Sequence, residues 1–147
     1  MKGKNMDELR LAGERGHAEH GWLDSWHSFS FADYHDPKHM GWGALRVINE
    51  DRVQPGQGFG THGHRDMEII SSVLEDALRL TDSMGNGSTI LPRAVPRLAA
   101  GTGMRPTECH HQKVRVTHSP MSCICPDTPG TSPLSNRLDP APPATTV

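Results

Sequence analysis

Short apolar runs alternate with turn-forming residues over the first two thirds of the chain. Between about residues 16 and 103, Gly, Asn, Asp and Pro interrupt the apolar runs at intervals of one strand and one turn, which is typical of an antiparallel all-β domain. Residues 44–50 (ALRVINE) and 67–75 (MEIISSVLE) predict strands. The Asn-Gly pair within residues 82–89 (DSMGNGST) predicts a tight hairpin between the flanking runs ALRLT and TIL.

This alternation stops after Glu108. Residues 119–147 contain seven prolines, little apolar material and no periodicity. Such a segment cannot bury enough apolar surface to offset the entropy that it loses on ordering. We therefore expect a folded domain over residues 11–108 and a disordered, unrelated tail over residues 109–147.

Composition and charge narrow the range of partners. The chain has 147 residues and a net charge of −2, and its Lys and Arg residues are scattered, so we expect no direct binding of nucleic acid. No apolar run approaches the ~20 residues of a membrane span, and residues 1–16 lack the apolar core of a secretory signal, so we expect a cytoplasmic protein that does not bind membranes. Three cysteines, Cys109, Cys123 and Cys125, fit no disulfide framework and are interpreted as reduced thiols.

Residues 58–70 (GFGTHGHRDMEII) carry the side chains with the clearest metal chemistry. If residues 62–74 are extended, His62, His64 and Glu68 share one face of a strand. Two imidazoles at that spacing can reach one metal ion, and a nearby carboxylate suits hard or borderline metals. The spacing alone also fits two solvated histidines, whereas the glycines before the pair favour a close backbone approach to a site. Five earlier histidines show no spacing of this kind and are interpreted as surface or packing residues: His17, His20, His27, His35 and His39.

Several segments resemble the pirin family of the cupin superfamily. They are residues 15–34 (RGHAEHGWLDSWHSFSFADY), 29–75, 82–88 (DSMGNGS) and 100–103 (AGTG), and the first is similar to bacterial pirin-like quercetin 2,3-dioxygenases. The resemblance covers about residues 11–108 and implies the first of two all-β cupin barrels (double-stranded β-helix, or jelly roll), with the second barrel missing. It further implies that His62, His64 and Glu108 bind one metal ion, with Fe(II) expected and Ni, Mn, Cu or Zn as alternatives.

The chain departs from the family pattern at several positions. The third ligand histidine of the family falls on Pro106, which offers no ligand atom. Asp76 and Arg93 stand where the family has a glycine or another residue tolerant of positive φ, and we expect them to distort the turns. His110 lies two residues after Glu108 and could replace the missing ligand in a continuing strand, whereas the alternative is that residues 109–112 (CHHQ) are solvated. Beyond Glu108 the resemblance is expected to end, as in a truncated or out-of-frame reading.

The resemblance implies a flavonol substrate such as quercetin, whose ring is cleaved by dioxygen at the metal, with Glu108 as metal ligand and base. Loss of one ligand and of the second barrel predicts impaired catalysis. Two other readings remain open. One is a metal-binding, redox-sensing co-regulator of transcription that acts on a protein partner without turnover. The other is a non-functional fragment, so the residues do not decide whether the protein is an enzyme.

Overall fold

The computed structural model describes residues 9–60, 65–81, 87–99, 108–111, 115–132 and 134–138. These residues form eleven β-strands and one short 3-10 helix, η1 (Ala12–Glu14), and they include no α-helix. None of the described helical residues makes a helix of the length and apolarity that crossing a membrane requires. The all-β class predicted from the alternation of apolar runs and turns is confirmed.

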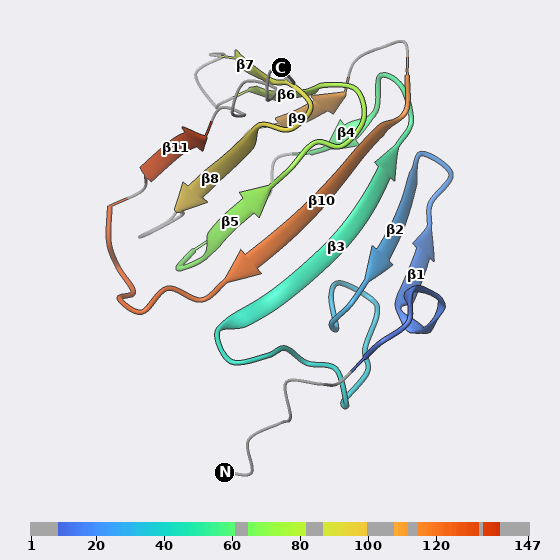
Figure 1. The fold of residues 1–147 in the computed structure, drawn as a ribbon, viewed down its shortest axis with the longest axis vertical. Helices are drawn as coiled ribbons and strands as arrows, with labels where there is room; N and C mark the ends of the chain where they lie inside the picture. Colours follow the sequence, from blue (N-terminus) through green and yellow to red (C-terminus); the bar gives the residue numbers. More distant parts are fainter. Residues whose placement is uncertain are drawn as a thin grey trace, which may run out of the picture.

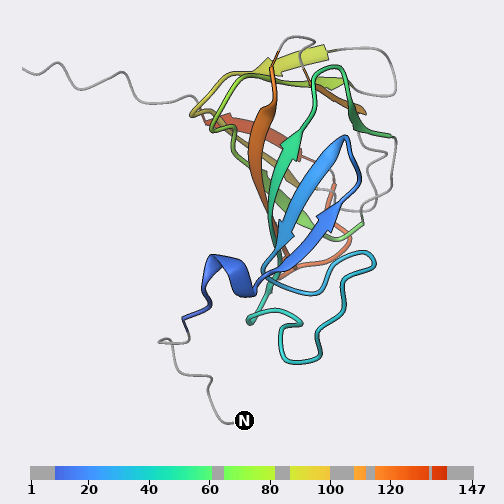
Figure 2. The same cartoon turned by 90° about the vertical axis from the view of Figure 1, so that its right-hand side faces the viewer.

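The strands pair into two antiparallel sheets (Figure 1). The four-stranded sheet lies at one end of the larger one, as Figures 1 and 2 both show. The seven-stranded sheet has the order β1 (Gly16–Glu19), β2 (Leu23–His27), β3 (Leu45–Val53), β10 (Thr117–Ile124), β5 (Glu68–Ser71), β8 (Val95–Ala99) and β11 (Leu134–Leu138). The four-stranded sheet has the order β4 (Gly58–Phe59), β9 (Glu108–His111), β6 (Leu78–Thr81) and β7 (Gly87–Ile90).

The long strand β3 shows how the sequence forms the large sheet. Its side chains alternate between the two faces, so that Val47, Asn49, Asp51 and Val53 are all buried on one face. Two apolar clusters complete the core of the described residues. One consists of Val73, Leu78, Ile90 and Ala94, and the other of Val47, Ile69 and Cys123 with Met67 and Met121 against it.

Two predicted elements are found and one is shorter than expected. All of residues 44–50 except Ala44 belong to β3, and β6 pairs with β7 as the predicted hairpin, whose connecting residues 82–86 lie outside the described part of the chain. The strand expected at residues 67–75 extends only from Glu68 to Ser71. Beyond Ser71, the amides of Ser72 and Leu74 still bond to carbonyls of β10, at 3.0 and 2.9 Å. This segment therefore follows β10 without continuing the regular strand.

The expectation of disorder over residues 109–147 is corrected where the structure describes strands. β10 lies between β3 and β5 and pairs with both, and β11 pairs with β8. β10 escapes sequence analysis because its buried residues include the polar Thr117 and Ser119, and because Pro120 has no amide to donate. The carbonyl of Pro120 nevertheless accepts a hydrogen bond from Ser72. For residues 139–147, outside the described part, the expectation stays a prediction.

Asp76 and Arg93 adopt the positive φ angles of the glycine-like positions that they occupy, whereas the sequence led us to expect that they distort these turns. Their φ angles are 63° and 72°, in the left-handed region that side chains disfavour. The turn at Arg93 is held by a hydrogen bond from its amide to the carbonyl of Val73, at 2.9 Å. Because the surrounding pairing fixes these turns, each residue stores about 1–2 kcal/mol of conformational strain.

Candidate metal centre

Of the predicted ligands, only Glu108 falls within the described part of the chain. His62, His64 and Pro106 lie outside the described residues, whereas Glu108 is the first residue of β9. β4 ends at Phe59, three residues before His62, and Phe59 pairs with Cys109, the neighbour of Glu108. The topology therefore brings the backbone of Glu108 beside the strand that leads into the histidine pair.

His110, the candidate replacement for the missing third ligand, lies on the same strand as Glu108. β9 extends from Glu108 to His111, so the continuing strand that His110 would need is present. Residues 108 and 110 occupy the same face of a strand because alternate positions share a face. The backbone of His110 pairs with Gly58 on one side and Arg79 on the other. Whether His110 serves as a ligand stays a prediction.

Glu68 does not continue a strand from the histidine pair, which corrects the expectation of one extended segment over residues 62–74. Residues 65–67 are not in a strand, and Asp66 has a φ of 49°. Such a left-handed residue breaks the alternation on which the shared face depends. The Glu68 carboxylate instead forms an ion pair with Arg97 of the neighbouring strand β8, at 2.7 Å. Glu68 is therefore held by Arg97 and is not placed by strand periodicity.

A buried polar row on β2 and β3 was missed by sequence analysis. The Nδ1 atom of His27 lies 2.9 Å from Oδ1 of Asn49, and the Ser25 hydroxyl donates to the Asp51 carboxylate. All four side chains are buried. Burial raises the pKa of Asp51, although the hydrogen bond from Ser25 and the nearby His27 oppose the shift. The register of two strands aligns these residues, so no local motif could have identified them.

Glu50 forms a second network on the opposite face of β3. One carboxylate oxygen accepts a hydrogen bond from Arg15 at 2.9 Å, and the other lies 2.8 Å from Nε2 of His118 on β10. The hydrogen bond from Arg15 and, to a lesser degree, that from His118 lower the pKa of Glu50 against the effect of desolvation. Glu50 thus ties the N-terminal segment and β10 to the centre of the large sheet.

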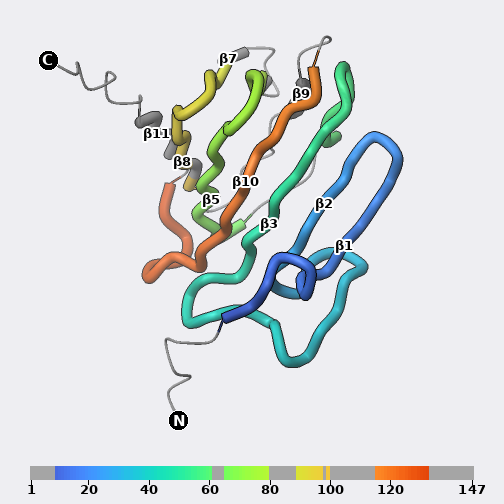
Figure 3. Tube along the Cα trace, turned by 45° about the vertical axis from the view of Figure 1, so that its right-hand side comes forward, coloured from blue at the N-terminus to red at the C-terminus, as the bar shows by residue number. Residues whose placement is uncertain are grey.

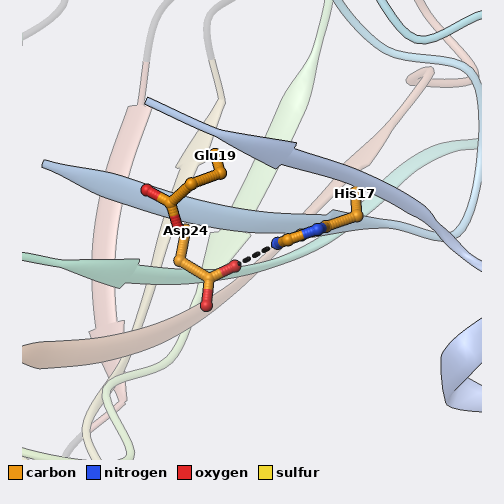
Figure 4. Close-up of side chains that lie close together, drawn as sticks. All are labelled: His17, Glu19 and Asp24. Atoms are coloured by element: carbon orange, nitrogen blue, oxygen red, sulfur yellow. Dashed lines mark hydrogen bonds and ion pairs between the residues drawn. The ribbon is translucent and has the colours of Figure 1, made fainter. Parts of the chain in front are cut away.

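A third cluster lies on the hairpin formed by β1 and β2 (Figure 4). His17, Glu19 and Asp24 each offer one ligand atom, and these atoms lie within 4.8 Å of one another. Nε2 of His17 is 2.7 Å from Oδ1 of Asp24. Among the described residues, these three form a group of side chains that could hold a metal ion. The sequence predicts only a surface or packing role for His17.

Cys123 and Cys125 are free thiols. Burial raises the pKa of Cys123 to about 11, so this thiol is protonated at neutral pH. Metals bind the thiolate, which makes Cys123 a poor ligand under these conditions. The geometry therefore gives no support to a metal site at the C-x-C pair of Cys123 and Cys125.

Comparison with known proteins agrees on one family. The family model described as Pirin matches residues 8–122. The expectation that the resemblance ends at Glu108 is therefore corrected, because the match continues into β10. The chain is 50% identical over 128 residues to quercetin 2,3-dioxygenase of Escherichia coli, a match that covers 87% of this chain and 55% of the relative. It is 47% identical over 93 residues to a pirin-like protein of Caulobacter vibrioides, covering 63% of this chain and 40% of the relative.

A solved structure gives the same result in three dimensions. The crystal structure of the bacterial pirin YhhW from Escherichia coli, in complex with nickel(II), superposes with a TM-score of 0.85 at 47% sequence identity. The superposition covers 90% of this chain and 57% of that one. The chain thus spans about half the length of the curated relatives that it matches.

Proposed function

The chain belongs to the pirin family, and from that membership we propose that it is a metal-binding cupin protein with the chemistry of the quercetin 2,3-dioxygenases. In this proposal His62, His64 and Glu108 bind one divalent ion. The pairing of Phe59 with Cys109 carries the proposal, because it puts the strand leading to the histidine pair beside the strand that begins at Glu108. We further propose a cytoplasmic location. We propose no nucleic-acid partner because the Lys and Arg residues are scattered, and no membrane partner because no apolar run approaches the length of a membrane span.

The donor set supports the metal assignment. Two imidazoles and one carboxylate suit borderline divalent metals, and we propose Fe(II), with Ni, Mn, Cu or Zn as alternatives. Nickel(II) in the related Escherichia coli pirin supports an ion of this series. The bound ion would supply Lewis-acid chemistry and a template for a flavonol substrate. His62 and His64 would anchor the ion, and Glu108 would both bind it and take the proton from the flavonol hydroxyl.

One feature supports low activity. Pro106 occupies the position of the third ligand histidine and offers no ligand atom. With fewer ligands the ion binds more weakly. We therefore propose slow or absent quercetin cleavage. The same feature favours a second candidate function, a metal-binding or redox-sensing protein that acts through a protein partner without turnover.

The metal assignment is tested by measuring metal content and affinity. Purified protein is loaded with Fe(II) or Ni(II), dialysed, and analysed for bound metal by mass spectrometry. We expect His62→Ala and His64→Ala to abolish binding at this centre and Glu108→Ala to weaken it. His35→Ala is the control, because His35 is an exposed histidine in the segment between β2 and β3. Metal content that is unchanged in both histidine variants would contradict the assignment.

Turnover separates the two candidate functions. Loss of quercetin absorbance together with oxygen uptake, measured on metal-loaded protein, reports ring cleavage. A rate above the metal-only background that is lost in Glu108→Ala supports the enzyme. No turnover in a folded, metal-loaded sample supports the binding protein instead.

A further inference from the structure

We propose that His17, Glu19 and Asp24 form a separate surface site for one divalent transition-metal ion, such as Zn²⁺, on the β1–β2 hairpin. The three side chains come from two adjacent strands (Figure 4). They share no residue with the proposed centre at His62, His64 and Glu108. An imidazole with two carboxylates is a donor set that suits zinc and its neighbours in the first transition series.

The register of the hairpin brings the three donors together. Glu19 and Asp24 are directly opposite each other across β1 and β2. His17 is two positions before Glu19, so both project from the same face of β1. The ligand atoms lie within 4.8 Å of one another. Bonds of about 2.0–2.2 Å to zinc put donor atoms roughly 3.4 Å apart in a tetrahedral site. The pair of His17 and Asp24, at 2.7 Å, would therefore have to move slightly apart, and no pair has to approach by more than about 1.5 Å.

The imidazole is already oriented for this role. The His17 ring stacks on Trp26, with ring centroids 4.1 Å apart and planes inclined by 17°. The guanidinium of Arg15 lies over the same tryptophan ring, 5.7 Å from its centroid. This stacking restrains the ring while Nε2 lies 2.7 Å from Asp24. Less side-chain entropy is therefore lost when Nε2 binds an ion.

The Glu19 carboxylate is held by the turn. The amide of Gly21 donates a hydrogen bond to Oε1 of Glu19 at 2.7 Å. The turn can place its amide there because Gly21 has a φ of 80°, which glycine adopts without strain. One oxygen of Glu19 is thus fixed by the backbone, and the other is left to bind an ion.

The charges around the hairpin favour a cation. Carboxylates directly opposite each other on neighbouring strands repel and destabilise the pair. Among the described residues, no ion pair joins Glu19 or Asp24 to a lysine or an arginine. Arg52 faces Asp24 across β2 and β3, but its ion pair is with Glu50, at 3.7 Å. A divalent ion would relieve the repulsion between the two carboxylates and leave Arg52 with Glu50.

The site is open to solvent at the edge of the sheet. β1 is an edge strand of the seven-stranded sheet (Figure 3). The side chains of His17 and Asp24 are 42% and 37% exposed, so water can complete the coordination shell. In the turn of the same hairpin, Trp22 packs edge-on against Phe59, with centroids 5.4 Å apart. Trp26 thus stacks on the His17 ring of the proposed site, and Trp22 instead contacts Phe59 of β4.

The test uses the full chain with His62→Ala and His64→Ala combined, which removes the other proposed centre. Zn²⁺ is titrated into this double variant by calorimetry, and we expect one bound ion. Adding His17→Ala or the nearly isosteric Asp24→Asn should weaken binding by about tenfold or more. His20→Ala is the matched control, because it is an exposed histidine in the turn of the same hairpin and lies outside the cluster. Affinity unchanged by His17→Ala and Asp24→Asn, with circular dichroism showing a folded protein, would overturn the proposal.

A second measurement locates the ion. Cu²⁺ bound by His17 should quench the fluorescence of the stacked Trp26, and in the double variant Trp26→Phe should remove most of this quenching while one Cu²⁺ still binds. Quenching that persists in Trp26→Phe would overturn the assignment. The two centres can fail independently. Binding lost with His17→Ala but not with His62→Ala and His64→Ala refutes the proposed function alone, whereas the reverse pattern refutes the hairpin site alone.

Discussion

Replacing Arg93 by glycine should stabilise the protein. Arg93 is exposed and has a φ of 72°, in the left-handed region. This conformation costs a residue with a side chain about 1–2 kcal/mol and costs glycine nothing. Glycine in turn loses about 0.5–1 kcal/mol more backbone entropy on folding. The net expectation for Arg93→Gly is a gain of about 0.5–1 kcal/mol in the free energy of unfolding.

The assay is urea denaturation followed by circular dichroism. Arg79→Gly is the matched control, because Arg79 is also exposed and its replacement changes the net charge equally, yet it lies within strand β6. There glycine should destabilise by about 0.5–1 kcal/mol. Arg93→Ala removes the same charge but keeps a Cβ atom, so we expect a change close to zero. If Arg93→Gly were no more stable than Arg93→Ala, or shifted in the same direction as Arg79→Gly, the argument from backbone strain would be refuted.

Three further predictions concern titration and metal binding. Glu50→Gln should lower the free energy of unfolding by about 1–2 kcal/mol at pH 7. Because the folded-state pKa of Glu50 is lowered, this difference should vanish as the pH falls through that pKa, as measured by urea denaturation at several pH values. Asp51→Asn should have the opposite pH dependence, because the folded-state pKa of Asp51 is raised. The variant should therefore gain stability relative to the original protein as the pH rises above the ordinary pKa of 3.8. An equal loss of unfolding free energy in the variant at pH 3 and at pH 7 would contradict this. Pro106→His should raise the affinity for Ni(II) by about tenfold in equilibrium dialysis, and an unchanged affinity would show that the third ligand was misplaced.

The sequence by itself determined the class of the fold and its local turns. The hairpin of β6 and β7 follows from Asn-Gly chemistry between two apolar runs. The family resemblance implies glycine-like positions at Asp76 and Arg93, and both residues have positive φ angles. Each of these signals lies within a few residues. The family resemblance was likewise readable, because its motifs occur as contiguous segments, and the family match bears it out.

The tertiary structure alone decided which distant segments pair. β10 carries polar residues and Pro120, so its own sequence argued against a strand, yet it pairs with both β3 and β5. Strand pairing with two neighbours satisfies its backbone, and the large sheet buries Thr117 and Ser119. The break at Asp66 was also hidden, because the spacing of His62, His64 and Glu68 is that of one continuous strand.

Some candidate sites could be found from local spacing, and others depend on strand pairing. His62 and His64 were identified from their spacing, which is a local property. The cluster of His17, Glu19 and Asp24 was not, because the partner of Glu19 depends on the register of β1 against β2. The network at Glu50 was even further from any local pattern, because its two partners come from the N-terminal segment and from β10. Register sets which side chains face one another across strands, and it follows from the packing of the whole sheet, which no single segment encodes.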